Sequence, residues 1–211
     1  MEESLQREIA YTCAKGDVRI RALCTPDEIK ALSFDKQFGS HAHYRSLYTK
    51  RTSLEENASQ PDANVVLAVA EHSHIVGFGV LNRPQPEDRW SKLDPPNIME
   101  VKAIEVARDW RATGIGDRIV RMLLAHPKVE DLIVYLVGYS WTWDLDGTRK
   151  SALQYRRMMI KLFEPYGFKE YETNEPNICL KPENIFMGRV GSNVTADLQN
   201  KFKWLRFGIE T

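Results

Sequence analysis

Arg111, Gly114 and Gly116 form an R-x-x-G-x-G pattern where a strand-like segment gives way to a helical one. The first turn of a helix carries unpaired backbone N–H groups and the positive end of the helix dipole, which together attract anions. A glycine has no Cβ atom, so a phosphate group can approach its backbone closely. The pattern therefore favours a phosphate-binding loop, although many strand–helix turns carry such glycines for packing alone. A dinucleotide site is disfavoured because the third glycine of that fingerprint is missing.

The elements that must position this loop follow from hydrophobic periodicity and turn residues. A strand is expected over 98–106, directly before the loop, and a helix over 116–125. Thr25 and Pro26 are a typical helix start. Residues 36–54 contain no acidic residue, and we expect a basic, helical, surface-exposed segment there. Further strands are expected over 17–23, 65–70, 75–81, 132–137, 168–171 and 185–190, and further helices over 153–163 and 194–207. This order predicts a mixed α/β sheet.

Composition excludes several classes of protein. The 211 residues carry 29 Lys and Arg against 29 Asp and Glu, so the basic footprint of a nucleic-acid binder is missing. No apolar run is long enough to span a membrane, and the charged N-terminus has no apolar signal region. Three unpatterned cysteines, at positions 13, 24 and 179, suit a reducing cytoplasm and offer no metal cluster.

A family resemblance adds to this pattern. The strands over 65–70 and 75–81 are expected to form a hairpin, because a short polar stretch joins them. This hairpin, the strand over 98–106, the R-x-x-G-x-G helix start and the later Gly167-Phe168 turn together resemble the GNAT family of acetyl-CoA-dependent N-acetyltransferases. The resemblance is closest to bacterial protein acetyltransferases whose target is acetyl-CoA synthetase. It is carried by segments at 87–90, 103–106, 141–148, 155–159, 175–176, 186–191 and 205–207. The first third of the chain matches only loosely.

The resemblance implies a coenzyme A site in the loop and in the strand before it. In the family, the loop holds the pyrophosphate and the strand binds the pantetheine arm through its backbone. The residues so implied are Ile104, Val106, Arg111, Ala112, Thr113, Gly114, Ile115, Gly116 and Asp117. Arg156, on the later helix, occupies a position that often contacts the cofactor. No metal is expected.

Two glutamates are candidates for the general base that takes a proton from the lysine ammonium. Glu100 lies 14 positions before Gly114, which matches the base of histone-type family members. Glu105 lies nearer the end of the strand but on the opposite face of an ideal strand, unless a bulge re-aims it. Alternatively, Glu100 is a solubilising charge, and Glu105 forms a buried ion pair with Lys102 or an arginine.

Other positions depart from the family or extend it. Many members place a tyrosine, which protonates the leaving thiolate, where this chain has Phe163. Tyr155 and Tyr166 are substitutes, although core packing suits both better. Trp141, Trp143 and Asp144 lie in a long loop, where exposed aromatics beside acids would bind a substrate protein; covering the core is the alternative.

The sequence therefore predicts one GNAT domain over residues 1–211, with its core over about 15–191, an N-terminal helical elaboration and a C-terminal helical extension over 192–211. The predicted activity is acetyl transfer from acetyl-CoA to an active-site lysine of acetyl-CoA synthetase in the cytoplasm, which inactivates the synthetase. Two alternatives remain: a small-molecule amine acetyltransferase, and a non-catalytic coenzyme A-binding partner of the synthetase.

Overall fold

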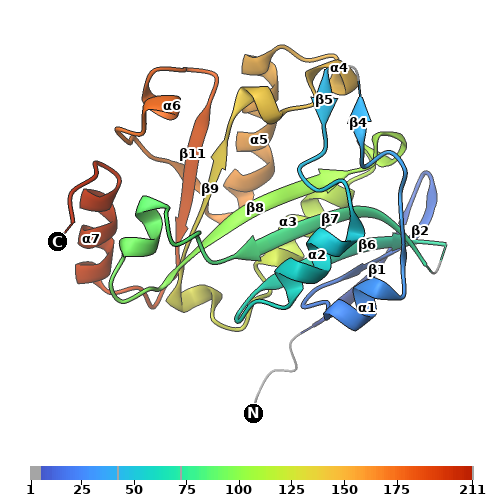
Figure 1. Cartoon of the computed structure of the whole chain (residues 1–211), viewed down its shortest axis with the longest axis horizontal. Helices are drawn as coiled ribbons and strands as arrows, with labels where there is room; N and C mark the ends of the chain where they lie inside the picture. The colour runs from blue at the N-terminus through green and yellow to red at the C-terminus, as the bar shows by residue number, and fades with distance from the viewer. Residues whose placement is uncertain (1–5, 42, 72, 211) are drawn as a thin grey trace. The chain divides into compact units, whose positions relative to one another are not determined.

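The computed structural model of the chain describes residues 6–41, 43–71 and 73–210. The chain divides into two compact units, residues 1–82 with 102–127 and residues 83–101 with 128–211. Both units are built from strands and helices around a mixed sheet, so the prediction of a mixed α/β fold is confirmed (Figure 1).

The first unit has its strands in the order β1-β2-β6-β7-β8. The pairs β1–β2, β2–β6 and β6–β7 are antiparallel, while the short strand β3 lies parallel to β7. The bounds are β1 (Glu8–Cys13), β2 (Gly16–Arg21), β3 (Ser33–Phe34), β6 (Asn64–Ala70), β7 (His74–Asn82) and β8 (Ile98–Val106). Only the last five residues of β8, from Lys102, belong to this unit. The predicted hairpin over 65–81 is confirmed.

Helices cover both faces of the first unit's sheet. The helices α1 (Pro26–Lys30) and α2 (Arg51–Ala58) bury Ile29 and Leu54 against Leu67 on one face. The helix α3 (Ile115–Leu123) packs on the other face, where Cβ atoms added to Gly77 and Gly79 of β7 would meet Ile119 at 3.1 and 2.5 Å. Glycines in β7 therefore let α3 approach the sheet closely.

Residues 36–54 do not form the helical segment predicted from their basic composition. They contain the two-residue strands β4 (Ser40–His41) and β5 (Tyr44–Arg45), which pair antiparallel, and α2 begins only at Arg51. Phe38 is buried against Phe78 with ring centroids 5.0 Å apart. Contacts with distant residues, rather than local periodicity, give this segment its structure.

The second unit has the strand order β8-β9-β11-β10, with β8 and β9 parallel and the other pairs antiparallel. Its core joins Trp90, Tyr135 and Phe186 to residues of the last helix, α7. The rings of Trp90 and Phe186 stack at 4.6 Å. The bounds are β9 (Ile133–Gly138), β10 (Lys169–Glu170), β11 (Ile185–Val190), α4 (Leu145–Thr148), α5 (Ala152–Phe163), α6 (Pro176–Cys179) and α7 (Ala196–Leu205).

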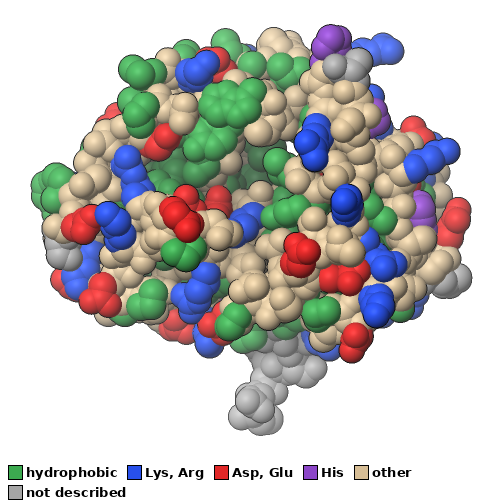
Figure 2. Space-filling view, in the orientation of Figure 1, with side chains coloured by type: hydrophobic (Ala, Val, Ile, Leu, Met, Phe, Trp, Pro, Cys, Tyr) green, Lys and Arg blue, Asp and Glu red, His purple; other side chains and the backbone are tan. Residues whose placement is uncertain are grey.

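Short 3-10 helices complete both units. They span Arg89–Lys92, Arg108–Trp110, Val129–Asp131, Ser140–Thr142 and Glu164–Tyr166. Lys and Arg side chains are interspersed with Asp and Glu side chains over the face shown in Figure 2, in keeping with the zero net charge. In the described part of the chain, every helix is too short or too polar to cross a lipid bilayer.

The side chain of Asn64 joins the connection between β2 and α1 to the end of α3. This side chain is fully buried, accepts a hydrogen bond from Leu23 N at 2.8 Å, and donates to the carbonyl oxygens of Met122 and Leu123, both at 3.0 Å. Both carbonyls belong to the last turn of α3, where helix geometry provides few donors, and Met122 O also accepts from Ala125 N at 3.3 Å. Asn64 therefore anchors the C-terminus of the helix whose N-terminus carries the glycine loop.

Replacing Asn64 with alanine is expected to lower the free energy of unfolding by about 3 kcal/mol, because its buried side chain makes three hydrogen bonds to backbone groups that are lost together. The matched control, Asn177→Ala, removes a surface hydrogen bond to Glu175 and is expected to change it by less than about 0.5 kcal/mol. Urea unfolding of both variants measures the difference. Equal effects would show that Asn64 does not support the helix.

Candidate active site

The R-x-x-G-x-G segment forms the N-terminus of α3, as predicted. Gly114 is the N-cap residue and has a φ of 84°, in the left-handed region. The first N–H bonded within the helix is that of Arg118, which reaches Gly114 O at 3.4 Å. Helix geometry thus leaves the N–H groups of Ile115, Gly116 and Asp117 without an acceptor inside the helix. A Cβ added to Gly116 would meet no atom within 4 Å, so the space beside it is open.

Tyr11 of β1 holds this loop in place. Its hydroxyl donates to Thr113 O at 2.5 Å, and the guanidinium of Arg118 stacks 3.5 Å from the centre of its ring. Arg118 Nη1 also donates to Gly114 O at 3.1 Å. Neither residue was identified from the sequence, although the alternation of Ile9, Tyr11 and Cys13 was a usable strand signal.

The start of the loop is fixed by its own residues. Arg111 Nε donates to Val106 O at 2.9 Å, and Thr113 Oγ1 donates to Trp110 O at 2.6 Å. Ala112 has a φ of 58°, which is unusual for a residue with a side chain. Arg111 therefore connects the loop to the end of β8, where Ile104 and Val106 are half-buried.

The two loop glycines are expected to respond differently to alanine. In Gly114→Ala, a Cβ would lie 2.8 Å from Tyr11 Oη and 2.9 Å from Arg118 Nη1, at a positive φ. We expect the free energy of unfolding to fall by about 1–2 kcal/mol. In Gly116→Ala the new Cβ meets open space inside a helix, so stability is expected to be unchanged or to rise by up to about 1 kcal/mol. Urea unfolding distinguishes them, and an unaffected Gly114→Ala would contradict the loop geometry.

Glu105 is buried at the end of β8 beneath the β4–β5 segment. Only 6% of its surface is exposed. Tyr44 Oη donates to its Oε1 at 2.5 Å, and Leu47 N donates to its Oε2 at 3.2 Å. The Ser46 hydroxyl is buried beside the carboxylate, and among the residues that the structure describes it has no hydrogen-bond partner of normal geometry. The carboxylate is thus enclosed by a segment about 60 residues earlier in the chain.

Burial raises the pKa of the Glu105 carboxyl above its ordinary value of 4.5. The hydrogen bonds from Tyr44 and Leu47 and the charge of Arg111 offset part of this rise. The charge of Arg111 acts on the Glu105 carboxylate, in keeping with the alternative in which an arginine neutralises it, and Arg111 Nε also donates to Val106 O. A carboxyl whose pKa is raised toward neutrality is suited to accept a proton from an amine.

This pKa has a consequence for stability. The folded chain holds the Glu105 proton more tightly than the unfolded chain, so the stabilising contribution is complete below pH 4.5 and is lost as the pH rises through the folded-state pKa. The free energy of unfolding of the wild type, measured relative to Glu105→Gln, should therefore fall as the pH rises above 4.5. Urea unfolding of both proteins across this range measures it. A difference that stays constant with pH would contradict the raised pKa.

Glu100 lies in the second unit, on the half-buried side of β8. It is the register partner of Tyr135 on β9. The Tyr135 hydroxyl is fully buried and has no hydrogen-bond partner of normal geometry among the described residues. Burial, and secondarily the charge of Glu100, raise the pKa of Tyr135. Glu100 and Glu105 therefore occupy different environments on one strand.

The three predicted substrate contacts differ in exposure. Trp141 is 56% exposed and stacks on Tyr139 at 4.7 Å, whereas Trp143 is buried and stacks on Tyr155 at 5.0 Å. Asp144 is 1% exposed and accepts a hydrogen bond from Gly147 N as the N-cap of α4. Trp143 and Asp144 thus cover and shape the loop, while Trp141 alone is open to a partner.

Arg156 and Phe163 are occupied by contacts within the second unit. Arg156 forms an ion pair with Glu170, and its Nε donates to Asn184 O at 3.3 Å. Phe163 is buried edge-to-face against Phe168 at 5.1 Å. The hydroxyl that many family members have at this position is therefore replaced by core packing.

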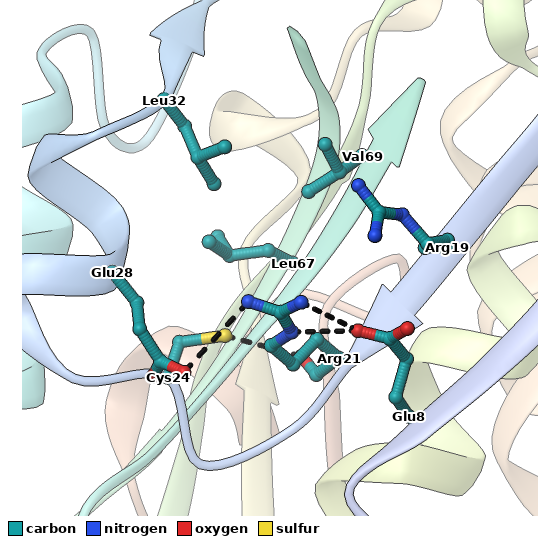
Figure 3. Close-up of a pocket in the computed structure, with 8 residues that line it drawn as sticks. All are labelled: Glu8, Arg19, Arg21, Cys24, Glu28, Leu32, Leu67 and Val69. Carbon is teal, nitrogen blue, oxygen red and sulfur yellow. Dashed lines mark hydrogen bonds and ion pairs between the residues drawn. The ribbon is translucent and has the colours of Figure 1, made fainter. Parts of the chain in front are cut away.

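A pocket at the edge of the first unit is a less suitable site. It has a volume of about 70 Å³ and contains Arg21, whose guanidinium is paired with Glu8 and lies 3.7 Å from Glu28 (Figure 3). Small-molecule sites usually measure roughly 300–1,000 Å³. Burial raises the pKa of the Cys24 thiol in its wall to about 12, so this thiol is un-ionised.

Comparisons with known proteins agree with the fold and with the loop. Residues 27–140 match the acetyltransferase (GNAT) family. The acetoin utilization protein AcuA of Bacillus subtilis is 30% identical over 194 residues, which cover 92% of this chain and 90% of that protein. AcuA of Bacillus licheniformis is 30% identical over 193 residues, with the same coverage. The chain belongs to the GNAT family of acetyltransferases.

A solved structure gives the same answer for the fold. The crystal structure of an acetoin utilization protein from Exiguobacterium sibiricum superimposes with a TM-score of 0.87. It is 26% identical and covers 95% of this chain and 93% of its own. The predicted family is confirmed, the chain is similar to AcuA over almost its whole length, and the protein is an acetyltransferase of this family.

Proposed function

We propose that this protein transfers the acetyl group of acetyl-CoA to a lysine of acetyl-CoA synthetase, with Glu105 as the general base. The observation that carries the proposal is that one unit holds both a helix N-terminus open to an anion and, at the end of the strand before it, a buried carboxyl with a raised pKa. The resemblance to synthetase-directed acetyltransferases supports the substrate. Three free thiols suit a reducing cytoplasm.

The residues of the loop fit the pyrophosphate of acetyl-CoA, which supplies the acetyl thioester. The N–H groups of Ile115, Gly116 and Asp117 point out of the helix start, and Arg111 adds positive charge. The open space beside Gly116 leaves room for a phosphate at the backbone. Backbone N–H groups near Ile104 and Val106 are proposed to bind the pantetheine arm and to polarise the thioester carbonyl.

Glu105 accepts the proton of the lysine ammonium in this proposal, so that the neutral amine can attack the thioester carbon. Its raised pKa brings the carboxylate closer to the pKa of the amine than an exposed glutamate would be. The exposed ring of Trp141 is proposed as a contact for the protein substrate. Coenzyme A leaves as a stabilised thiolate, which is compatible with a buried Phe163.

The test is acetylation of purified acetyl-CoA synthetase with acetyl-CoA, mapped by mass spectrometry. We expect one synthetase lysine to be acetylated by the wild type. Glu105→Gln should lower the rate by about 100-fold or more, the usual contribution of a general base. Glu100→Gln is the matched control on the same strand and should keep the rate within about threefold, since it lacks the proposed role.

Gly116→Ala is a second variant, because it is expected to fold normally and still to weaken acetyl-CoA binding by filling the space at the loop. An unmodified synthetase would overturn the proposed substrate, and acetylation of small amines alone would indicate the small-molecule alternative. Full activity of Glu105→Gln with loss in Glu100→Gln would assign the base to Glu100.

A further inference from the structure

The acid-free segment over 36–54 presents positive charge at the surface of the first unit. It contains four Lys and Arg residues, at positions 36, 45, 50 and 51, and no Asp or Glu. Arg51 forms an ion pair with Glu55 of α2. The side chains of Lys36, Arg45 and Lys50 are exposed, and among the described residues each is without an ion pair. The segment therefore carries three cations that the unit itself does not neutralise.

The acidic side chains close to this segment are engaged elsewhere. Asp35, just before it, is buried, lies 3.0 Å from His74 Nε2 and accepts a hydrogen bond from Gln37 N at 2.8 Å. Asp109, after β8, accepts from Gln37 Nε2 at 2.5 Å. Glu105 is buried beneath the segment. These carboxylates are turned toward the interior or toward neutral donors, so the cations are left to an outside partner.

An exposed leucine lies among the cations. Leu47 has 47% of its surface exposed, and it follows Arg45 by two residues. The side chains alternate here, since Tyr44 and Ser46 are at least half-buried toward Glu105 whereas Arg45 and Leu47 are exposed. The backbone N–H of Leu47 donates to Glu105 Oε2 at 3.2 Å. The outward face of the segment is therefore tied directly to the proposed base.

Hydrogen bonds within the segment fix its shape. Ser46 N donates to Gly39 O at 3.0 Å, and His41 Nε2 lies 3.0 Å from Gln37 O. Phe38 anchors the segment to the core. Figure 2 shows Lys and Arg side chains over the place where Figure 1 draws β4 and β5. A surface that is already ordered loses little conformational freedom when a partner binds to it.

We propose that the outward face of this segment is a docking surface for an acidic part of the protein that carries the acceptor lysine. The docking surface consists of Lys36, Arg45, Leu47 and Lys50. Charge complementarity identifies the occupant, because exposed cations without carboxylate partners attract and steer an acidic surface. The exposed leucine and the zero net charge of the chain suit a protein better than a nucleic acid. The inference rests on the proposed protein acceptor and adds the chemistry of the surface around its lysine.

The experiment measures the binding of two fluorescein-labelled peptides to the full-length protein by fluorescence anisotropy at low ionic strength. In the first peptide, glutamates and a leucine flank a single lysine, and in the second, glutamines replace the glutamates. We expect the wild type to bind the glutamate peptide about tenfold more tightly than the glutamine peptide. Added salt should reduce this difference, because exposed charges are screened.

Variants of the docking surface locate the binding. Arg45→Glu combined with Lys50→Glu should abolish the preference for the glutamate peptide, because like charges now face each other. The matched control, Lys15→Glu combined with Arg121→Glu, changes the net charge equally at exposed positions of the β1–β2 turn and of α3. It should keep the preference within about threefold of wild type. Leu47→Ser should weaken the glutamate peptide by about fivefold through the lost apolar contact.

The same variants are then tested with acetyl-CoA synthetase and with acetyl-CoA. The docking variant should raise the KM for the synthetase by about tenfold, with kcat within about threefold of wild type. The Kd for acetyl-CoA should stay within about twofold of wild type, because the cations bind the protein and not the cofactor. A large rise in this Kd would assign the cations to coenzyme A and overturn the docking surface.

The remaining outcomes distinguish this proposal from the one on which it rests. Equal affinity for the two peptides, binding of neither, an unchanged preference in the docking variant, or tighter binding of a single-stranded oligonucleotide would overturn the docking surface. Acetylation of the synthetase without peptide selectivity would overturn it and leave the proposed substrate. A selective wild type that leaves the synthetase unmodified would support the docking surface and overturn the proposed substrate.

Discussion

The hydrogen bonds that enclose the Glu105 carboxylate are the constraint on which the candidate site depends. A carboxylate removed from water must be compensated by donors, and here the donors are Tyr44 and the backbone of Leu47. The same contacts fix the β4–β5 segment over the end of β8. The two strands of this segment pair over two residues each. This enclosure therefore orders a segment with little structure of its own, and it buries a carboxyl whose pKa the burial raises.

The glycine loop depends on a second set of distant contacts. Its carbonyl at Thr113 is held by Tyr11, and the opposite end of α3 is held by Asn64. Both partners come from the first third of the chain. The anion-binding loop itself is short and general, so the particular geometry of this acetyltransferase is set by the N-terminal strands that support it.

The sequence predicted the elements whose signals are local. The strand over 98–106, the helix after Gly114 and the capped start at Thr25 all follow from periodicity, glycine and capping residues. The Tyr44–Glu105 contact joins residues 61 positions apart, so no local pattern indicates it. The basic composition over 36–54 reports charge but says nothing about packing, and the helical segment that it suggested does not form before Arg51. The burial of Trp143 and Asp144 was likewise decided by a loop that turns back on α5, which spacing does not encode.

The central claim is that Glu105 is a base whose pKa is raised by burial. The most direct measurement is a pH titration of its side-chain carboxyl carbon by 13C NMR, with the resonance assigned by its absence in Glu105→Gln. The account predicts a titration midpoint above the ordinary value of 4.5. A midpoint at or below 4.5 would show that the hydrogen bonds and the charge of Arg111 outweigh burial, and would contradict the account.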